Sequence, residues 1–91
     1  MATIAVMFKI DGEGVAHALR QAGEKLDATN GQLIVDFSAV GRIDPAGLAA
    51  MEKLAGIADD RGVKLALRGV NIEVYKVLKL AKLAPRFAFL S

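Results

Sequence analysis

The sequence predicts an α/β domain with a four-stranded, mostly parallel sheet and three or more helices. Short apolar runs rich in strand-forming residues alternate with segments whose apolar residues recur at helical spacing, in the order βαβαβαβ. No linker, repeat or low-complexity stretch interrupts that order. Because 91 residues suit one domain, residues 1–91 are expected to fold as a single unit.

The first strand is expected over residues 4–10, an apolar run that ends at the Asp- and Gly-rich residues 11–14. A helix is then predicted over residues 15–28. Its apolar residues fall on one face, namely Val15, Leu19, Ala22 and Leu26. Asn30 or Gly31 suits a left-handed C-cap that would end this helix.

Residues 33–37 form the second predicted strand, and residues 40–48 lead from it into a helix over residues 45–60. Asp44 is a typical N-cap, and Pro45 suits the first helical position because its missing N–H is not needed there. The inward residues predicted for this helix are Leu48, Met51, Leu54, Ala55 and Ala58. A short turn between a strand and a helix is where α/β domains usually place function.

Residues 63–68 alternate apolar and basic residues, which is typical of a strand with one solvated face. Asn71 is expected to cap a third helix over residues 72–82. Its predicted inward residues are Val74, Val77, Leu78 and Ala81. Pro85 prevents further helix, and residues 86–90 are expected to add a last short strand.

Composition excludes several classes of protein. The chain has no cysteine, so it has no disulfide, thiolate zinc site or thiol nucleophile, and its one histidine, His17, cannot build a histidine-rich metal site. No apolar run approaches the ~18 residues of a membrane span. The first residues lack the basic and apolar regions of a signal peptide. We therefore expect a cytoplasmic protein without a cofactor or a metal.

No group of residues points to catalysis. His17 is expected on the polar side of the first helix, and no Ser-His-Asp set or carboxylate pair is evident. Asp44 could act as a general base or a phosphoacceptor, but an N-cap role explains it more simply. Asp36 could correspond to the acidic residue of a response-regulator receiver, but the chain is too short for one. We do not expect an enzyme.

Charge is distributed unevenly along the chain. Residues 63–91 hold six basic residues and one acidic residue, a net charge of +5, whereas residues 1–62 hold six basic and nine acidic residues, a net charge of −3. Late in the third helix, a basic stripe is formed by Lys76, Lys79, Lys82 and Arg86. Such a stripe suits anionic lipid, nucleic acid or an acidic partner, or is simply solvated. It has no interleaved aromatic residues for base stacking, so no nucleic-acid partner is expected.

Three segments together resemble the STAS domain family of sulfate transporters and anti-sigma factor antagonists. Residues 33–48 are similar to the family's strand, its Asp-Ser/Thr-x-Gly-Leu turn and the start of the helix that follows. Residues 61–67 and 70–78 are similar to the next strand and helix. The resemblance covers residues 31–83 well and implies a compact STAS-like fold.

Two departures from the family pattern stand out. Family members usually begin with a two-strand hairpin, whereas one strand fits here. Where members regulated by phosphorylation carry Ser or Thr, this chain has Pro45, followed by Ala46, and neither can accept a phosphate. The nearest hydroxyl is that of Ser38. A phosphate at position 45 would sit at a helix N-terminus and repel a docked partner. Because this position has no hydroxyl group to carry a phosphate, we expect a domain that binds its partner constitutively.

The resemblance implies a non-enzymatic protein-binding domain that uses the turn and the outer face of the second helix. The expected partner-binding residues are Arg42, Asp44, Pro45, Ala46, Gly47, Ala49, Ala50, Lys53 and Ile57. Small residues and one lysine on that helix face would let another backbone approach closely. A mildly apolar helix surface with no partner is the alternative interpretation.

Three functions remain open. The first is an anti-sigma factor antagonist-like regulator that binds an anti-sigma-type kinase. The second is an accessory subunit bound to the ATPase of an Mla-type lipid ABC transporter. Segments 69–71 and 74–75 resemble the small STAS subunit of such a transporter. The third is a small-ligand sensor. A homodimer is compatible with each of them, and a membrane is expected to be reached only through a partner.

Overall fold

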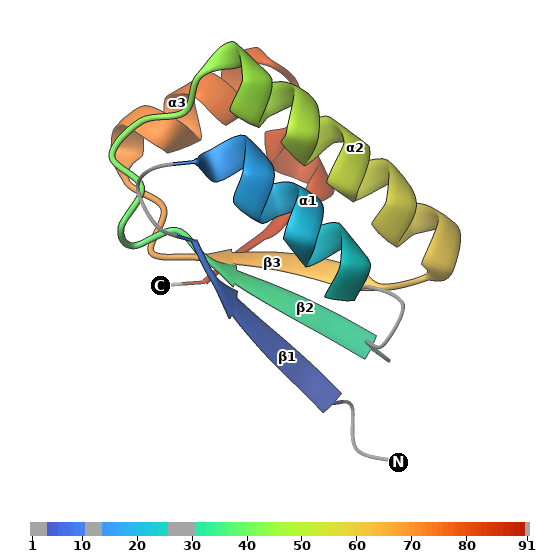
Figure 1. Cartoon of the computed structure of the whole chain (residues 1–91). Coiled ribbons are helices and arrows are strands. Elements are labelled where there is room, and N and C mark those ends of the chain that lie inside the picture. Colours follow the sequence, from blue (N-terminus) through green and yellow to red (C-terminus); the bar gives the residue numbers. More distant parts are fainter. Residues whose placement is uncertain (1–3, 11–13, 26–30, 91) are drawn as a thin grey trace.

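Strands and helices alternate along the chain as the sequence predicts (Figure 1). A computed structural model describes residues 4–10, 14–25 and 31–90. The strands are β1 (Ile4–Lys9), β2 (Gly31–Asp36), β3 (Lys64–Arg68) and β4 (Ala88–Leu90). The helices are α1 (Val15–Lys25), α2 (Pro45–Arg61) and α3 (Ile72–Leu80), followed by a 3-10 turn, η1 (Ala84–Arg86).

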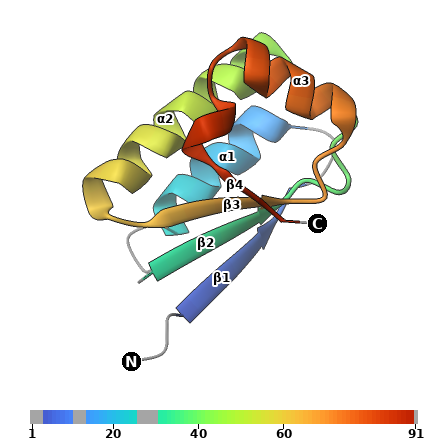
Figure 2. The same ribbon diagram turned by 180° about the vertical axis from the view of Figure 1, so that it is seen from behind.

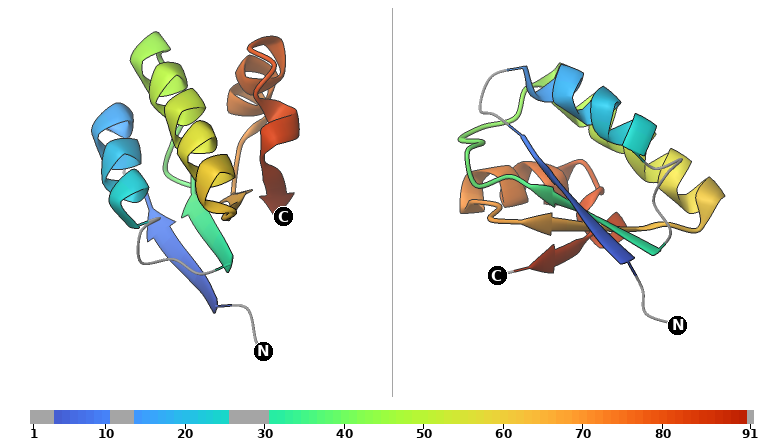
Figure 3. Two further views of the ribbon diagram at one scale, coloured as in Figure 1. Left: turned by 90° about the vertical axis from the view of Figure 1, so that its right-hand side faces the viewer. Right: turned by 60° about the horizontal axis from the view of Figure 1, so that its bottom comes forward.

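The four strands form one sheet in the order β1-β2-β3-β4, and every neighbouring pair is parallel. The three helices all lie on one side of this sheet, as the end-on view shows (Figure 3). The opposite face carries no helix of the described residues, and β4 lies at one edge beside β3 (Figure 2). The predicted fold class is confirmed.

The core lies between the sheet and the helices. β2 contributes Leu33 and Val35, and Phe37 just beyond it is fully buried. On the helix side the most buried residues include Leu19, Ala22, Met51, Leu54 and Leu78. Because these residues repeat at helical spacing in α1, α2 and α3, burying each apolar face fixes all three helices against the same side of the sheet.

Strand β3 departs from the predicted alternation. Lys64 and Arg68 are exposed, but Ala66, which shares their face, is 0% exposed. Ala66 pairs in register with Ile34 on one side and Ala88 on the other. Its methyl group is short and lies between two neighbouring strands, and it is buried even though no helix of the described residues covers this face.

Several element ends also differ from prediction. Gly31 begins β2 with φ 124° instead of capping the first helix, and Leu26, Ala28 and Asn30 lie outside the described residues. α2 ends at Arg61, one residue beyond the predicted end, where Gly62 adopts a left-handed C-cap. That cap lets Val63 donate its N–H to Ala58 O at 2.9 Å, which delays the start of β3 to Lys64.

The third helix ends two residues earlier than predicted. Lys82 has φ 61°, and Leu83 donates its N–H back to Leu78 O at 2.8 Å. This Schellman-type ending leaves Ala81 exposed at the C-cap, whereas the sequence predicted it to face inward. Arg86 belongs to η1 and not to the last strand. Among the described helices, none is both long and apolar enough to span a bilayer.

Candidate protein-binding site

The turn before α2 is built around Asp44. Its backbone is extended, with φ −93° and ψ 173°, and its Oδ1 accepts a hydrogen bond from the Gly47 N–H at 2.7 Å. Pro45 occupies the first helical position. Asp44 is therefore an N-cap, and its carboxylate satisfies one of the donors that a helix leaves free at its start.

Gly47 is buried in the first turn of α2. A Cβ atom at this position would lie 2.7 Å from Cγ1 of Ile43 and 3.2 Å from Oδ1 of Asp44. No ordinary side chain fits so close to two neighbours. Glycine thus allows Ile43 to pack over the first turn of α2 while Asp44 keeps its capping bond.

Asn71 fixes the same turn from the other side. Its Oδ1 accepts from the Val74 N–H at 2.8 Å, which caps α3 as predicted. Its Nδ2 donates to the carbonyl oxygens of Val40 at 3.2 Å and Gly41 at 3.0 Å. One side chain therefore caps α3 and holds the loop that leads into α2.

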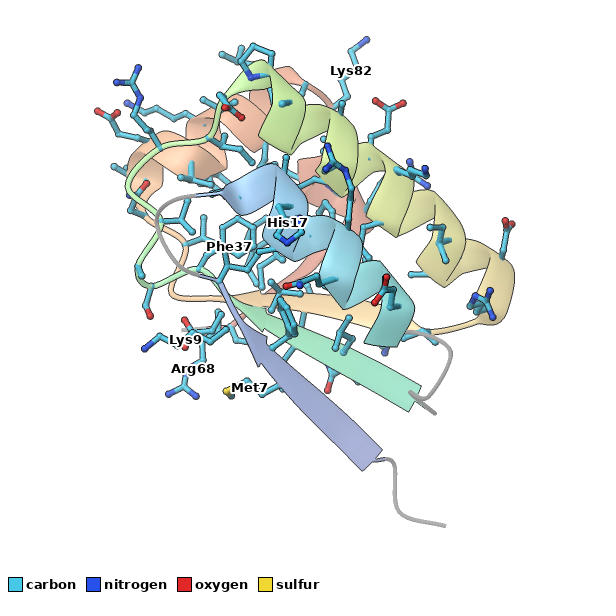
Figure 4. The ribbon with its side chains drawn as sticks, viewed as in Figure 1. Met7, Lys9, His17, Phe37, Arg68 and Lys82 are labelled. Carbon is cyan, nitrogen blue, oxygen red and sulfur yellow. The ribbon has the colours of Figure 1, made fainter. Side chains whose placement is uncertain are left out.

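The other end of that loop is held by Asp36 and Ser38. Oδ1 of Asp36 accepts from the Ser38 N–H at 2.8 Å. The Ser38 hydroxyl, this N–H and the nearby charges of Lys9 and Arg68 hold the pKa of Asp36 below its ordinary value of 3.8. Lys9 and Arg68 flank Asp36 in register on the uncovered face of the sheet (Figure 4). Asp36 thus has a structural role in shaping the turn.

The structure separates the predicted partner-binding residues into three groups. The residues exposed around the turn and along α2 are Arg42, Asp44, Pro45, Ala46, Ala49 and Lys53. Gly47 is buried and acts through packing. Ala50 and Ile57 were predicted on the outer face, but they are half-buried and pack against the core. They face α1, which lies directly beside α2 (Figure 3).

Ala50 and Ile57 line a groove of about 380 Å³ between α1 and α2. Its apolar floor is completed by Leu19, Gly23 and Leu54, and its rim carries Arg20, Glu24, Lys53 and Arg61. The α1 residues of this groove were not predicted as site residues. No local pattern marks them, because the groove exists only where two helices meet.

A second hollow, of about 510 Å³, adjoins the turn itself. It is lined by Gly14, Val15, Ala16, Arg42, Ile43, Asp44 and Pro45. The exposed edge of the turn is therefore continuous with the start of α1. The turn, the outer face of α2 and these two hollows are the parts of the candidate site, and they carry small, apolar and charged groups of both signs.

The residues considered for catalysis are not brought together. His17 projects outward from α1 and is exposed (Figure 4). Asp36 and Asp44 are each engaged by the backbone of a following residue. Among the described residues, no three His, Cys, Asp or Glu side chains group closely enough to hold a metal ion.

Comparison with known proteins defines the class. A protein-family model described as "Mlab, STAS domain" matches residues 7–88. That match covers most of the chain, and the chain belongs to the STAS domain family. The resemblance seen in residues 31–83 is thereby confirmed and extended in both directions.

The most informative relatives are two MlaB proteins. The intermembrane phospholipid transport system binding protein MlaB of Escherichia coli (strain K12) is 39% identical over 57 residues, which are 63% of this chain and 59% of that protein. MlaB of Shigella flexneri gives the same values. The match thus spans less than two thirds of the length of each relative.

Solved structures share the fold at lower identity. A candidate anti-sigma factor antagonist from Thermotoga maritima is 20% identical with a TM-score of 0.77, over 99% of this chain and 83% of that one. A sulfate transporter family protein from Wolinella succinogenes is 23% identical with a TM-score of 0.78, over 98% and 80%. These likenesses concern the fold alone.

Proposed function

We propose that this chain is a non-enzymatic STAS subunit that binds the ATPase of an Mla-type lipid transporter through the turn and α2. The observation that carries the proposal is Pro45 at the exposed start of α2, in a turn that is hydrogen-bonded by the side chains of Asp44 and Asn71. A structural subunit needs a permanently formed docking surface and no phosphorylation switch. The family match and the two MlaB relatives support this choice of partner.

A second candidate is an anti-sigma factor antagonist-like regulator that lacks the usual phosphorylatable residue. It would use the same surface, because the expectation of partner docking at this turn comes from the STAS resemblance and is the same for both candidates. Pro45 and Ala46 argue against the phosphorylation cycle of such a regulator, since neither has a hydroxyl group. A regulator of this type would bind its kinase constitutively. In both cases the protein would act in the cytoplasm.

Affinity purification of the tagged chain from its native cell distinguishes the transporter subunit from the regulator. Recovery of an ATPase together with a permease supports the transporter subunit. Recovery of an anti-sigma-type kinase supports the regulator and contradicts the first proposal.

A phosphorylation assay tests constitutive binding. Incubation of the chain with that kinase and ATP, followed by intact-mass spectrometry, is expected to show no added phosphate. A stoichiometric phosphate on Ser38 would contradict constitutive binding.

Ala49→Asp tests the surface itself. Ala49 is exposed on α2, and a carboxylate there would have to be desolvated in the complex, so affinity is expected to fall at least about tenfold. Ala88→Asp, on the uncovered face of the sheet, is the matched control and should bind normally. Equal affinity of the Ala49 variant and the unmodified chain would exclude α2 as the docking surface.

A further inference from the structure

The outer face of α3 and the adjoining β4 carry a second surface that the proposed docking site does not use. Its apolar members are unusually exposed for their size: Leu80 is 84% exposed, Ile72 69%, Tyr75 39%, Phe89 37% and Leu90 38%. The rings of Tyr75 and Phe89 meet edge to face, with centroids 5.1 Å apart. This contact joins the helix to the strand, and we call the surface that carries these five exposed apolar residues the α3 face.

Basic side chains are interleaved with these apolar ones. Lys76 lies between Ile72 and Leu80 on the helix surface, one turn from each, and Lys79 lies one turn beyond Tyr75. Lys79 and Lys82 line a hollow beside Tyr75 and Phe89. Lys76, Lys79 and Lys82 form no ion pair within the described part of the chain. Arg86 does not belong to this group, because it is bound to Asp59 of α2 at 2.7 Å.

Lys82 adds a conformational observation. It is the one described residue other than glycine with a positive φ, at 61°, in a position where helices usually carry glycine. Its side chain projects away from the body of the molecule (Figure 4). A lysine at this position keeps a cation at the end of the α3 face despite the unfavourable backbone conformation.

We infer that the α3 face binds directly to an anionic membrane surface. Leu80 and Ile72 would enter the boundary between headgroups and acyl chains, while the lysine stems lie along it and their ammonium groups contact lipid phosphates. Interleaved lysines favour lipid over protein, because lysine is depleted from protein interfaces but enriched on interfacial helices. The inference departs from the sequence expectation that a membrane is reached only through a partner.

The test is partition of the full chain onto vesicles of phosphatidylcholine alone and of phosphatidylcholine with phosphatidylglycerol. Binding is expected only to the anionic vesicles and to weaken as salt is raised. Tyr75 gives a direct optical signal, since the chain has one tyrosine and no tryptophan. Its emission is expected to change on binding, because it lies inside the α3 face.

Two variants separate insertion from simple charge attraction. Leu80→Asn should lower vesicle affinity roughly tenfold, because it removes the most exposed apolar side chain from the boundary. Lys79→Gln should lower it roughly fivefold. Lys64→Gln makes the same charge change at the exposed first residue of β3 and is the matched control, with affinity expected to stay within about twofold. All three positions are exposed, so circular dichroism should show an unchanged fold.

Three outcomes would overturn the inference. These are no binding to anionic vesicles, equal losses in the Lys79 and Lys64 variants, or full binding by the Leu80 variant. If the Leu80 and Lys79 variants instead lose a protein partner while vesicles bind nothing, the α3 face is a protein interface. The vesicle results leave the proposed docking on α2 unaffected, because that docking uses none of these residues.

Discussion

Nδ2 of Asn71 lies 3.0 Å from the carbonyl oxygen of Gly41, although 30 residues separate the two in sequence. The same nitrogen contacts the Val40 oxygen at 3.2 Å, and the side-chain oxygen caps α3. The start of α3 and the loop before α2 are thus held by one amide. The shape of the candidate docking turn therefore depends on a residue outside it.

Asn71→Ser should separate the two roles of this amide. Serine can still cap α3, but it cannot reach the loop, so the variant loses the bonds to Val40 and Gly41. We expect a loss of about 1 kcal/mol in the free energy of unfolding and weaker partner binding. Asn71→Ala removes the cap as well and should cost about 2 kcal/mol in total. Urea unfolding measures both, and equal stability of the two variants would contradict the dual role.

Gly47→Ala tests the close approach of Ile43 to α2. The added Cβ would lie 2.7 Å from Cγ1 of Ile43, so we expect a loss of about 1–3 kcal/mol in unfolding free energy. Gly56→Ala is the matched control in the same helix. Apart from its chain neighbours and the backbone of its own helix, no atom would lie within 4 Å of its Cβ, and alanine is the better helix former, so this variant should gain about 0.5–1 kcal/mol. Thermal unfolding of both proteins gives the comparison, and two shifts of the same sign would contradict it.

Much of the fold can be predicted from the sequence because its signals are local. Asp44 with Pro45 marks the start of α2, Gly62 marks its end, and Asn71 marks the start of α3. These residues act on their own backbone neighbours, within three or four positions. A reader of the sequence alone can therefore identify them without knowing which elements pack together.

The candidate site was predicted less completely because its geometry depends on contacts between elements. Ile57 faces α1 and lines a groove with Leu19 and Gly23, which helical spacing within α2 alone could not reveal. Ala66 is buried by strands on both sides, contrary to the alternation of its own strand. The bond from Asn71 to Gly41 likewise joins residues that only the folded sheet brings together.

The stability contributed by Asp36 should depend on pH. Its pKa is lowered in the folded state chiefly by the Ser38 hydroxyl. The contribution of Asp36 to the free energy of unfolding is therefore fully present above the ordinary pKa of 3.8 and is lost as pH falls through the lower folded value. Asp36→Asn should therefore be less stable than the unmodified chain at neutral pH. The difference should shrink below about pH 3.8. Urea unfolding across this range measures it, with exposed Asp60→Asn as the control. A difference that does not change with pH would contradict the assignment.

Ala46→Glu should change stability and binding in opposite directions. Ala46 is exposed in the first turn of α2, which has no acidic residue, and a carboxylate there interacts favourably with the positive end of the helix dipole. We expect the free energy of unfolding to rise by about 0.3–1 kcal/mol. Partner affinity should nevertheless fall about tenfold, because the new charge must be desolvated on the docking surface. Thermal unfolding and titration calorimetry with the purified partner measure the two effects. Since the variant is not destabilised, loss of binding cannot be ascribed to unfolding, and unchanged affinity would place the docking surface elsewhere.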